Sequence, residues 1–509
     1  MPARVLFVGL DASDKDLLER WAGEDQLPNF RRIQAQASEY QLANTMLTLP
    51  TGVWPEIWSG RSCGRSGFYF PIRQLHTGET SVRPLEPGEV DATGFWSLAA
   101  DAGRRVAAVD IPWDLTSQAS NCVHVSGWGT HDRPFGTSSS PPQLLDELRA
   151  RHGEYPLWTD TFAHSRTHPP CYCPRRTDAE FQQLLDGLLD GLDAKLALFL
   201  DLLDREEWDL FACAFGEPQC VGHQFWHFLD SPQAPEHFRD AIRDVYRKLD
   251  HALGRVIEAA GDEAVVLVLA SQAMDTDTGG AQLIPEVLVR LGFGSGDGAA
   301  ARLRSRLPLG LRAGIRSILP APLRTPLQAT AGSLPSPLDS SRTRAVAFDG
   351  DTCSWIRLNV KGREPHGSVS PDDAATVLEE LRTELLALED PVTGQPIVLQ
   401  AVTALEAFGP EPHTDVPDLM VAFRQDLGRI DACRSERVGL VRQIHVTPAG
   451  RSGAHPHAPS WLWISGAGFE PGARHEGDVL DIAPTVLSLL DVPTAPALDG
   501  LPLERTAIA

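Results

Sequence analysis

The chain has 509 residues, with 45 Lys and Arg against 68 Asp and Glu, which gives a formal charge of −23 at pH 7 with His neutral. A nucleic-acid-binding protein needs a basic stripe to meet the phosphate backbone, so this balance predicts no nucleic-acid-binding surface. Apolar residues make up 42% of the chain, which is enough to bury a sizeable core and excludes a disordered protein.

The N-terminal apolar run, residues 5–10, is too short for the hydrophobic segment of a signal peptide. No apolar stretch reaches the roughly 18 residues needed to cross a bilayer, so we expect no membrane attachment. The eight Cys are scattered without the spacing of a disulfide framework, which indicates reduced thiols. Together these features predict a cytoplasmic protein.

Short apolar runs of strand length recur along the chain and alternate with helical patterns. The runs are residues 5–10, 106–109, 210–215, 265–270, 419–423 and 461–464. The helical patterns are residues 178–204, 240–259, 373–388 and 481–490. Runs that are apolar on both faces are typical of parallel strands covered by helices. The order predicts an α/β protein with a doubly wound, mostly parallel sheet and helices on both faces.

Composition divides the chain further. Residues 1–292 form the first part of the predicted α/β core, and residues 293–342 are a Gly-, Ala-, Arg- and Pro-rich insertion. In residues 343–410 a strand, a helix and another strand predict an inserted cap subdomain. Residues 411–509 then return to the core.

Polar residues follow several of the predicted strands. Asp11 comes directly after the first strand, Glu217, Cys220 and His223 follow the strand at 210–215, and His455 precedes the strand at 461–464. Open parallel sheets bind ligands at the carboxyl ends of their strands, so we expect these side chains to lie close together. A carboxylate and two imidazoles are the usual ligands of a zinc-type site.

Each of these residues also has an ordinary structural interpretation. Asp11 could cap the following helix, and His223 could donate a hydrogen bond to backbone. Cys220 could be a small buried residue or, with a lowered pKa, a nucleophile or metal ligand.

The order of short motifs carries more information than any one residue. Residues 5–12 are followed by Leu27-Pro28-Asn29-Phe30, by residues 49–55, by Gly222-His223 and by residues 481–485. In this order the chain resembles the alkaline phosphatase superfamily, most closely its type I phosphodiesterases and nucleotide pyrophosphatases. The resemblance implies an alkaline-phosphatase-like fold.

The resemblance also implies a chemistry. In that family two metal ions, usually zinc, flank a Thr or Ser nucleophile that attacks phosphorus. Asp11 matches the metal ligand after the first strand, and His223 and His455 match two further ligands. Thr51 matches the nucleophile, with Thr48 as the alternative. The substrate implied is a small anion or ester containing phosphate or a related group.

The sequence departs from the family at three metal ligands. Gln219 stands where the Asp-x-x-x-His motif has its Asp. Ser271-Gln272-Ala273-Met274 stands where the family has Ser-Asp-His-Gly, so an Asp and a His are missing. We therefore expect a degenerate site with at most one divalent metal, zinc before manganese or iron, held by Asp11, His223 and His455.

Three hypotheses of function remain open on the sequence, and the sequence favours the first, since three polar site residues persist at their expected places. The first is a hydrolase or transferase with one metal, with Thr51 as nucleophile and Glu217 and Cys220 as further catalytic groups. The second is a catalytically silent relative, without metal, that is retained for binding or assembly. The third is a metal-independent enzyme in which His223, Glu217, Cys220 or His455 acts as acid or base.

Overall fold

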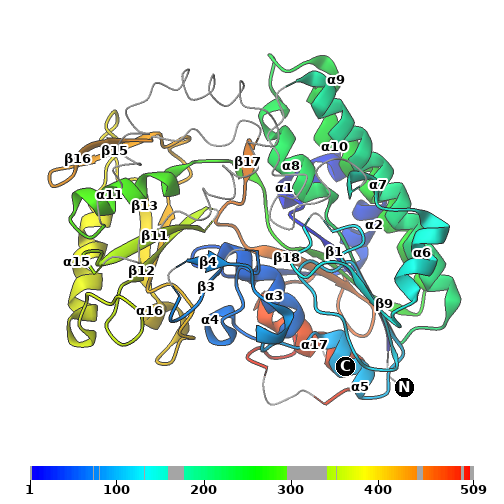
Figure 1. Cartoon of the computed structure of the whole chain (residues 1–509). Helices are drawn as coiled ribbons and strands as arrows, with labels where there is room; N and C mark the ends of the chain where they lie inside the picture. Colours follow the sequence, from blue (N-terminus) through cyan, green and yellow to red (C-terminus); the bar gives the residue numbers. More distant parts are fainter. Residues whose placement is uncertain are drawn as a thin grey trace, which may run out of the picture. The chain divides into compact units, whose positions relative to one another are not determined.

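The computed structural model describes residues 3–72, 74–79, 81–130, 132–158, 177–294, 341–350, 352–443, 451–493 and 498–504. Two compact units make up the chain (Figure 1). The first unit comprises Met1–Arg73, Pro84–Asp277 and Thr447–Ala509, and the second comprises Gln74–Arg83 and Thr278–Val446. The insertion predicted for residues 293–342 lies almost entirely outside the described residues.

The first unit is built on a nine-stranded sheet with the strand order β19-β2-β18-β9-β1-β8-β5-β6-β7. Its central strands β9, β1, β8, β5 and β6 are parallel, and β18 and β7 run antiparallel to their neighbours. The strands are β1 (Arg4–Leu10), β2 (Ser38–Ala43), β5 (Val106–Val109), β6 (Cys122–Ser126), β7 (Ser138–Ser140), β8 (Leu210–Phe215), β9 (Ala264–Ala270), β18 (Ser460–Ser465) and β19 (Arg474–Asp478). This confirms the doubly wound, mostly parallel sheet.

Helices cover both faces of this sheet, because its central strands are apolar on both sides. On β1, Leu6, Val8 and Leu10 belong to one core cluster, and Val5 and Phe7 belong to another. The first core includes α1 (Lys15–Gly23), α2 (Pro28–Gln36), α6 (Leu144–His152), α7 (Asp178–Arg205), α8 (Glu217–Phe225), α9 (Glu236–Arg239) and α10 (Ala241–Ala260). The second core includes α3 (Val53–Ser59), α5 (Phe95–Asp101) and α17 (Ile482–Leu489).

The longest of the described helices, α7, confirms the predicted helix at residues 178–204. Its first turn is closed by a capping box in which Thr177 accepts from the backbone N–H of Glu180 and the Glu180 side chain accepts from that of Thr177. All but one of its Leu residues belong to the core or pack against it. The other short elements of this unit are α4 (Cys63–Ser66), β10 (Asp275–Thr276), β17 (Gly453–Ala454), and the 3₁₀ turns Pro50–Gly52, Pro87–Glu89, Pro156–Trp158, Trp226–Phe228 and Val479–Asp481.

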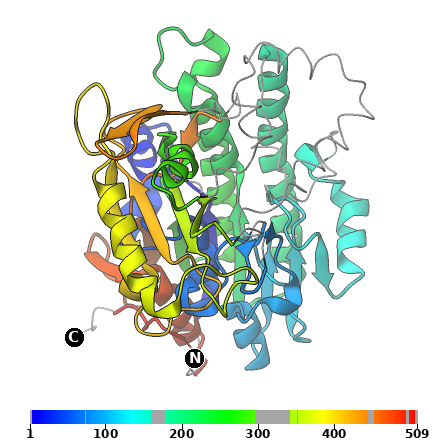
Figure 2. The same cartoon turned by 60° about the vertical axis from the view of Figure 1, so that its left-hand side comes forward.

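The second unit contains a four-stranded antiparallel sheet with the order β11-β12-β14-β13. Its strands are β11 (Ala345–Gly350), β12 (Cys353–Leu358), β13 (Val398–Thr403) and β14 (Leu419–Phe423). Figure 2 shows α15 (Ala374–Leu386), in yellow, along this sheet, where Leu381 and Leu385 join the core. The remaining elements are α11 (Ile284–Arg290), α16 (Ala404–Phe408), the hairpins β3 (Gln74–Leu75) with β4 (Val82–Arg83) and β15 (Ala432–Ser435) with β16 (Gly439–Arg442), and the 3₁₀ turns Gly280–Leu283 and Pro371–Asp373.

One apolar run lies in a different sheet from the one expected. Residues 419–423 form β14, which pairs antiparallel with β12 and β13 of the second unit rather than with the main sheet. All five of its residues are apolar and buried, and a run of this kind suits a central strand of either sheet. Composition therefore could not distinguish the two partners. Among the described helices, none is long and apolar enough to cross a membrane.

Candidate functional site

The parallel register of the first unit brings three predicted strand ends to one edge. Leu10 of β1 pairs with Phe215 of β8 on one side and with Ala270 of β9 on the other. The residues that follow these strands, Asp11, Gly216 and Ser271, therefore start from the same edge of the sheet. The candidate site is built at this edge.

Asp11 is fully buried and held by neutral donors. Its Oδ1 accepts hydrogen bonds from Nε1 of Trp54 at 2.7 Å and from Oγ of Ser271 at 3.2 Å. An indole N–H and a hydroxyl thus stand at a carboxylate oxygen that the family resemblance assigns to a metal. Trp54, on α3, was not singled out by the sequence reasoning.

His223 and His455 lie side by side, as expected. Their ring centroids are 4.9 Å apart and their planes meet at 69°. Nδ1 of His223 lies 2.8 Å from the carbonyl oxygen of Gly453, and Nδ1 of His455 lies 3.2 Å from that of Ala273. A carbonyl only accepts, so in both rings Nδ1 carries the proton and, in the neutral form, Nε2 carries the lone pair.

The pairing of two short strands explains why these histidines meet. β17, directly before His455, pairs antiparallel with β10, which follows the loop after β9. β17 also packs closely on α8, because a Cβ at Gly453 would lie 2.4 Å from the carbonyl oxygen of Gly222. Only glycine permits that approach, and it brings His455 next to His223.

The side chain of Glu217 is bonded to two buried groups outside the histidine pair. It is the first residue of α8, and its Oε1 accepts from Oη of Tyr155 at 2.7 Å and lies 3.5 Å from Nζ of Lys195. All three side chains are buried. Cys220, one turn further along α8, is also buried. These contacts tie Glu217 to a lysine and a tyrosine that the sequence reasoning missed.

A signal for Lys195 was present in the sequence. In the helix at 178–204 it occupies the apolar stripe formed by Leu188, Leu192 and Phe199, at spacings of four, three and four. A lysine on the buried face of a helix requires a partner in the core, so its position predicts a buried acidic group nearby.

Thr51 lies in the 3₁₀ turn Pro50–Gly52, directly before α3, and is half-buried. Its Oγ1 donates to the carbonyl oxygen of Tyr69 at 2.6 Å. Gln272 donates from Nε2 to the carbonyl oxygen of Pro50 at 2.9 Å. The neutral amide of Gln272 therefore contacts the turn that carries Thr51. Oγ1 of Thr48 donates to the carbonyl oxygen of Thr45 at 3.2 Å.

The buried Glu56, on α3 just after this turn, is expected to make the free energy of unfolding depend on pH. Burial raises its pKa to about 7, although hydrogen bonds from Cys63 act to lower it. The folded chain keeps this proton up to about pH 7, whereas the unfolded chain releases it near pH 4.5. The group's contribution to stability is therefore complete below pH 4.5 and is lost as the pH rises to 7.

Between pH 4.5 and 7.5 we expect the wild type to lose stability relative to Glu56→Gln, by on the order of 3 kcal/mol. Glutamine keeps an acceptor for the backbone N–H of Cys63, which lies 2.9 Å from Oε1. Urea unfolding across this pH range measures the difference. The exposed Glu236→Gln is the control, and parallel curves for wild type and Glu56→Gln would contradict the prediction.

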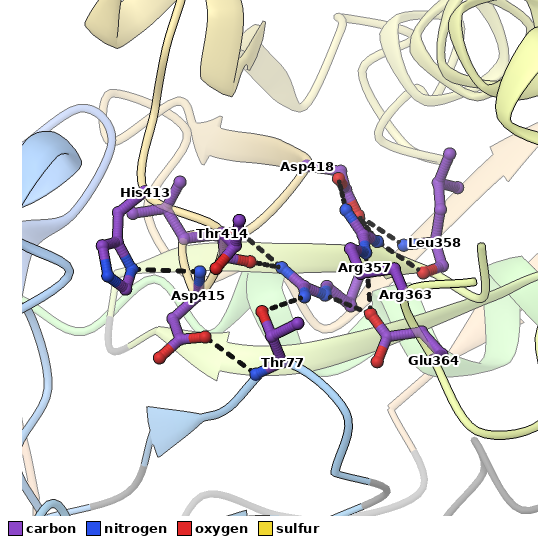
Figure 3. A network of polar contacts seen from close by, with 10 residues as sticks. Thr77, Arg357, Leu358, Arg363, Glu364, His413, Thr414, Asp415 and Asp418 are labelled. Atoms are coloured by element: carbon purple, nitrogen blue, oxygen red, sulfur yellow. Dashed lines mark hydrogen bonds and ion pairs between the residues drawn. The ribbon is translucent and has the colours of Figure 1, made fainter. Parts of the chain in front are cut away.

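The basic residues near the predicted cap form a closed network within the second unit (Figure 3). Arg357 is 1% exposed, and its guanidinium donates to Oε1 of Glu364 at 2.8 Å, to the carbonyl oxygens of Thr414 and Val416, and to Oγ1 of Thr77. Arg363 donates to the same oxygen of Glu364 at 2.8 Å and to both carboxylate oxygens of Asp418. Their charges are matched by Glu364 and Asp418, so both arginines are paired within the second unit.

The ligand set does not fit a two-metal centre. In the part of the chain that the structure describes, no three or more His, Cys, Asp or Glu side chains are grouped so that they could hold a metal ion. His223 and His455 form a pair, Asp11 is bonded to Trp54 and Ser271, and Glu217 is bonded to Tyr155 and Lys195. Asp275, the residue after the Ser271–Met274 segment, is exposed on β10.

Comparisons with known proteins identify the family. No curated protein sequence matches the chain. Among solved structures, the alkaline phosphatase PafA is 14% identical, with a TM-score of 0.56 and 99% of each chain covered. Phosphonoacetate hydrolase from Sinorhizobium meliloti, in complex with phosphonoformate, is 12% identical, with a TM-score of 0.53 and 96% of each chain covered.

An inactive murine ectonucleotide pyrophosphatase/phosphodiesterase 5 in complex with AMP is 13% identical, with a TM-score of 0.51, and 98% of this chain and 97% of that chain are covered. At these identities the likeness shows a common alkaline-phosphatase-like fold. The model of the type I phosphodiesterase/nucleotide pyrophosphatase family matches residues 5–280, which is more than half of the chain. The chain therefore belongs to the type I phosphodiesterase/nucleotide pyrophosphatase family.

Proposed function

We propose that this chain is a binding member of its family, which holds a phosphate ester or a related small anion at the strand-end site without two-metal hydrolysis. The observation that supports this most directly is the state of Asp11, whose Oδ1 is bonded to Trp54 and Ser271. Gln219, Gln272 and Ala273 stand at three family ligand positions and offer no charge to offset a cation.

Two surviving features favour retention of a ligand. His223 and His455 are held in one orientation by backbone carbonyls, so they present two fixed imidazoles to the site. Thr51, half-buried in the turn at the start of α3, adds a hydroxyl. Fixed polar groups at the carboxyl edge of an α/β sheet are the usual means of orienting a small ligand.

The test combines metal content, binding and turnover. AMP, which is present in the murine relative's complex, and inorganic phosphate are the probes for calorimetric binding. We expect AMP to bind, His455→Asn to weaken that binding, and the exposed His237→Asn to leave it unchanged. We also expect no hydrolysis of p-nitrophenyl phosphate or bis-p-nitrophenyl phosphate above background.

Two outcomes would overturn this proposal. Elemental analysis showing about two equivalents of zinc, with turnover that Thr51→Ala abolishes, would indicate the full family mechanism. Failure of AMP, phosphate and a sulfate ester to bind would leave the site without a ligand of the proposed class.

The second candidate is a hydrolase with one divalent metal. The observation that favours it is the histidine pair, because metal-ligating histidines usually direct their second nitrogen to a carbonyl or carboxylate. His223 and His455 would hold the ion, and Asp11 would join them by exchanging its bonds to Trp54 and Ser271 for the metal. The ion would supply Lewis-acid chemistry. Thr51 would be the nucleophile, with Glu217 and Cys220 as further groups.

About one equivalent of zinc, manganese or iron, together with turnover lost on chelation, would favour this candidate over the first. Turnover that persists in the presence of a chelator would instead favour metal-independent acid–base chemistry by these side chains. The cytoplasmic location predicted from the sequence stays a prediction.

A further inference from the structure

Lys195 of the first unit lies in a buried polar cluster, and the site chemistry proposed above gives Lys195 no role. Lys195 of α7, Tyr155, Glu217 of α8 and Asp110, directly after β5, are each no more than 2% exposed. Burying an ammonium group costs several kcal/mol unless close partners offset it. This chain bears that cost at the carboxyl edge of the sheet, where the candidate site lies.

Lys195 contacts both sides of the turn between β8 and α8. Its Nζ donates to the carbonyl oxygen of Ala214 at 3.2 Å and lies 3.5 Å from Oε1 of Glu217. Ala214 is the penultimate residue of β8, and Glu217 is the first residue of α8. Lys195 therefore ties the end of the strand to the start of the helix.

The start of α8 depends on these contacts. Its N-cap residue, Gly216, has no side chain to accept from the first turn, and no side-chain cap bond is present. A negative charge on Glu217 in the first turn suits the helix dipole, and Lys195 and Tyr155 fix where that charge lies. His223 follows six residues later on the same nine-residue helix.

Two glycines, which have no side chain, leave space for the side chains of this cluster. A Cβ at Gly129 would lie 2.6 Å from Cε of Lys195 and 2.8 Å from Oδ2 of Asp110. A Cβ at Gly191, one turn before Lys195 on α7, would lie 2.5 Å from Oη of Tyr155. Any other residue at either position would displace the cluster.

Asp110 adds a second carboxyl group to the same buried volume. Its Oδ2 accepts from the backbone N–H of Gly129 at 2.7 Å. Burial raises its pKa to about 6, and the charge of Lys195 opposes that rise. Removing the ammonium would leave two buried carboxyl groups without their cation, which would favour movement of the start of α8.

We propose that Lys195 is a positioning residue: by joining Ala214 to Glu217 it sets the start of α8 and thereby the position of His223 beside His455. An effect of Lys195 on ligand binding rests on the proposed function, whereas an effect of Lys195 on the position of the histidine pair does not. Two independent measurements therefore test these two effects separately.

The first measurement is AMP affinity. Lys195→Met keeps the length of the side chain and removes its charge. We expect AMP binding to weaken about tenfold, the lower end of the effect of losing a residue that orients a ligand-contacting side chain. Lys248→Met is the matched control, because Lys248 pairs with Asp193 at 2.6 Å on the solvent side of the neighbouring helix α10. Its affinity should equal that of the wild type.

The second measurement is the nitrogen spectrum of selectively ¹⁵N-labelled histidines, which reports the tautomer and surroundings of each ring. We expect the His223 and His455 signals to shift in Lys195→Met and in Tyr155→Phe, which removes only the bond to Glu217. The exposed His251 should not shift in either variant. A merely structural role would lower the melting temperature and leave these signals in place.

The proposal is overturned if both variants fold with unchanged His223 and His455 signals. If Lys195→Met does not fold, Tyr155→Phe decides by the same two readouts. If the wild type does not bind AMP, the proposed function fails, and the histidine spectra still test the positioning role.

Discussion

Replacing Glu364 with leucine is expected to lower the free energy of unfolding of the second unit by about 3–5 kcal/mol, because it leaves the buried guanidinium of Arg357 without its carboxylate. Arg357 is 1% exposed and pairs with Glu364 at 2.8 Å, whereas Arg363 keeps Asp418 as a second partner. The cost therefore falls mainly on Arg357.

The double variant Glu364→Leu with Arg357→Met should recover much of this loss. Removing both charges eliminates the unpaired ion, so the energy of the double variant should differ from the sum of the single variants. The carbonyl oxygens of Thr414 and Val416 would still lose their donor, so recovery should be incomplete.

Hydrogen exchange of the β12 amides, read by mass spectrometry in increasing urea, measures this unit separately from the first. Asp426→Asn removes the partner of Arg424 from an exposed ion pair in the same unit and should have little measurable effect. Equal exchange in Glu364→Leu and Asp426→Asn would show that the network does not stabilise this unit.

Placing metal ligands at positions 219, 272 and 273, where the family resemblance predicts them, is expected to create a metal centre. The variant with Gln219→Asp, Gln272→Asp and Ala273→His adds two carboxylates and an imidazole to Asp11, His223 and His455. We expect about two equivalents of zinc to remain after dialysis, since six such ligands suit a two-metal site. Asp11 would exchange its bonds to Trp54 and Ser271 for the metal.

The matched control carries Gln219→Asn, Gln272→Asn and Ala273→His, which changes side-chain size in the same way without adding charge. Elemental analysis should show less zinc in this control than in the carboxylate variant. Equal and low zinc in both would mean that the correspondence between these positions and the family's ligands is wrong. Hydrolysis of bis-p-nitrophenyl phosphate, measured in the same samples, shows whether Thr51 then acts as a nucleophile.

The elements of the first unit followed closely from sequence periodicity. The helices predicted at residues 178–204 and 240–259 appear as Asp178–Arg205 and Ala241–Ala260, because their apolar residues recur at the helical spacing over many turns. Residues 419–423 show the limit of the method. A short, wholly apolar run indicates a buried strand but not its neighbour, and here the neighbour is β12.

The candidate site was predictable in part for a similar reason. The parallel strands deliver their carboxyl ends to one edge, which predicted the position of His223. His455 precedes its strand and reaches the same edge because β18 runs antiparallel to β9, and there the two rings meet. The partners of Glu217 were not predictable from that argument. Lys195 lies 22 residues earlier on another helix, and only packing shows that its Nζ reaches Glu217.

By itself the amino-acid sequence determined the family and the alternation of strands and helices, because these depend on residue order and local periodicity. It also predicted the loss of three metal-ligand positions. Only the tertiary structure decided what the remaining polar side chains do. It placed Trp54 and Ser271 on Asp11, Lys195 and Tyr155 on Glu217, and Glu364 on Arg357. The physical reason is that a buried charge must be matched by groups close in space, and distance along the chain does not specify which groups those are.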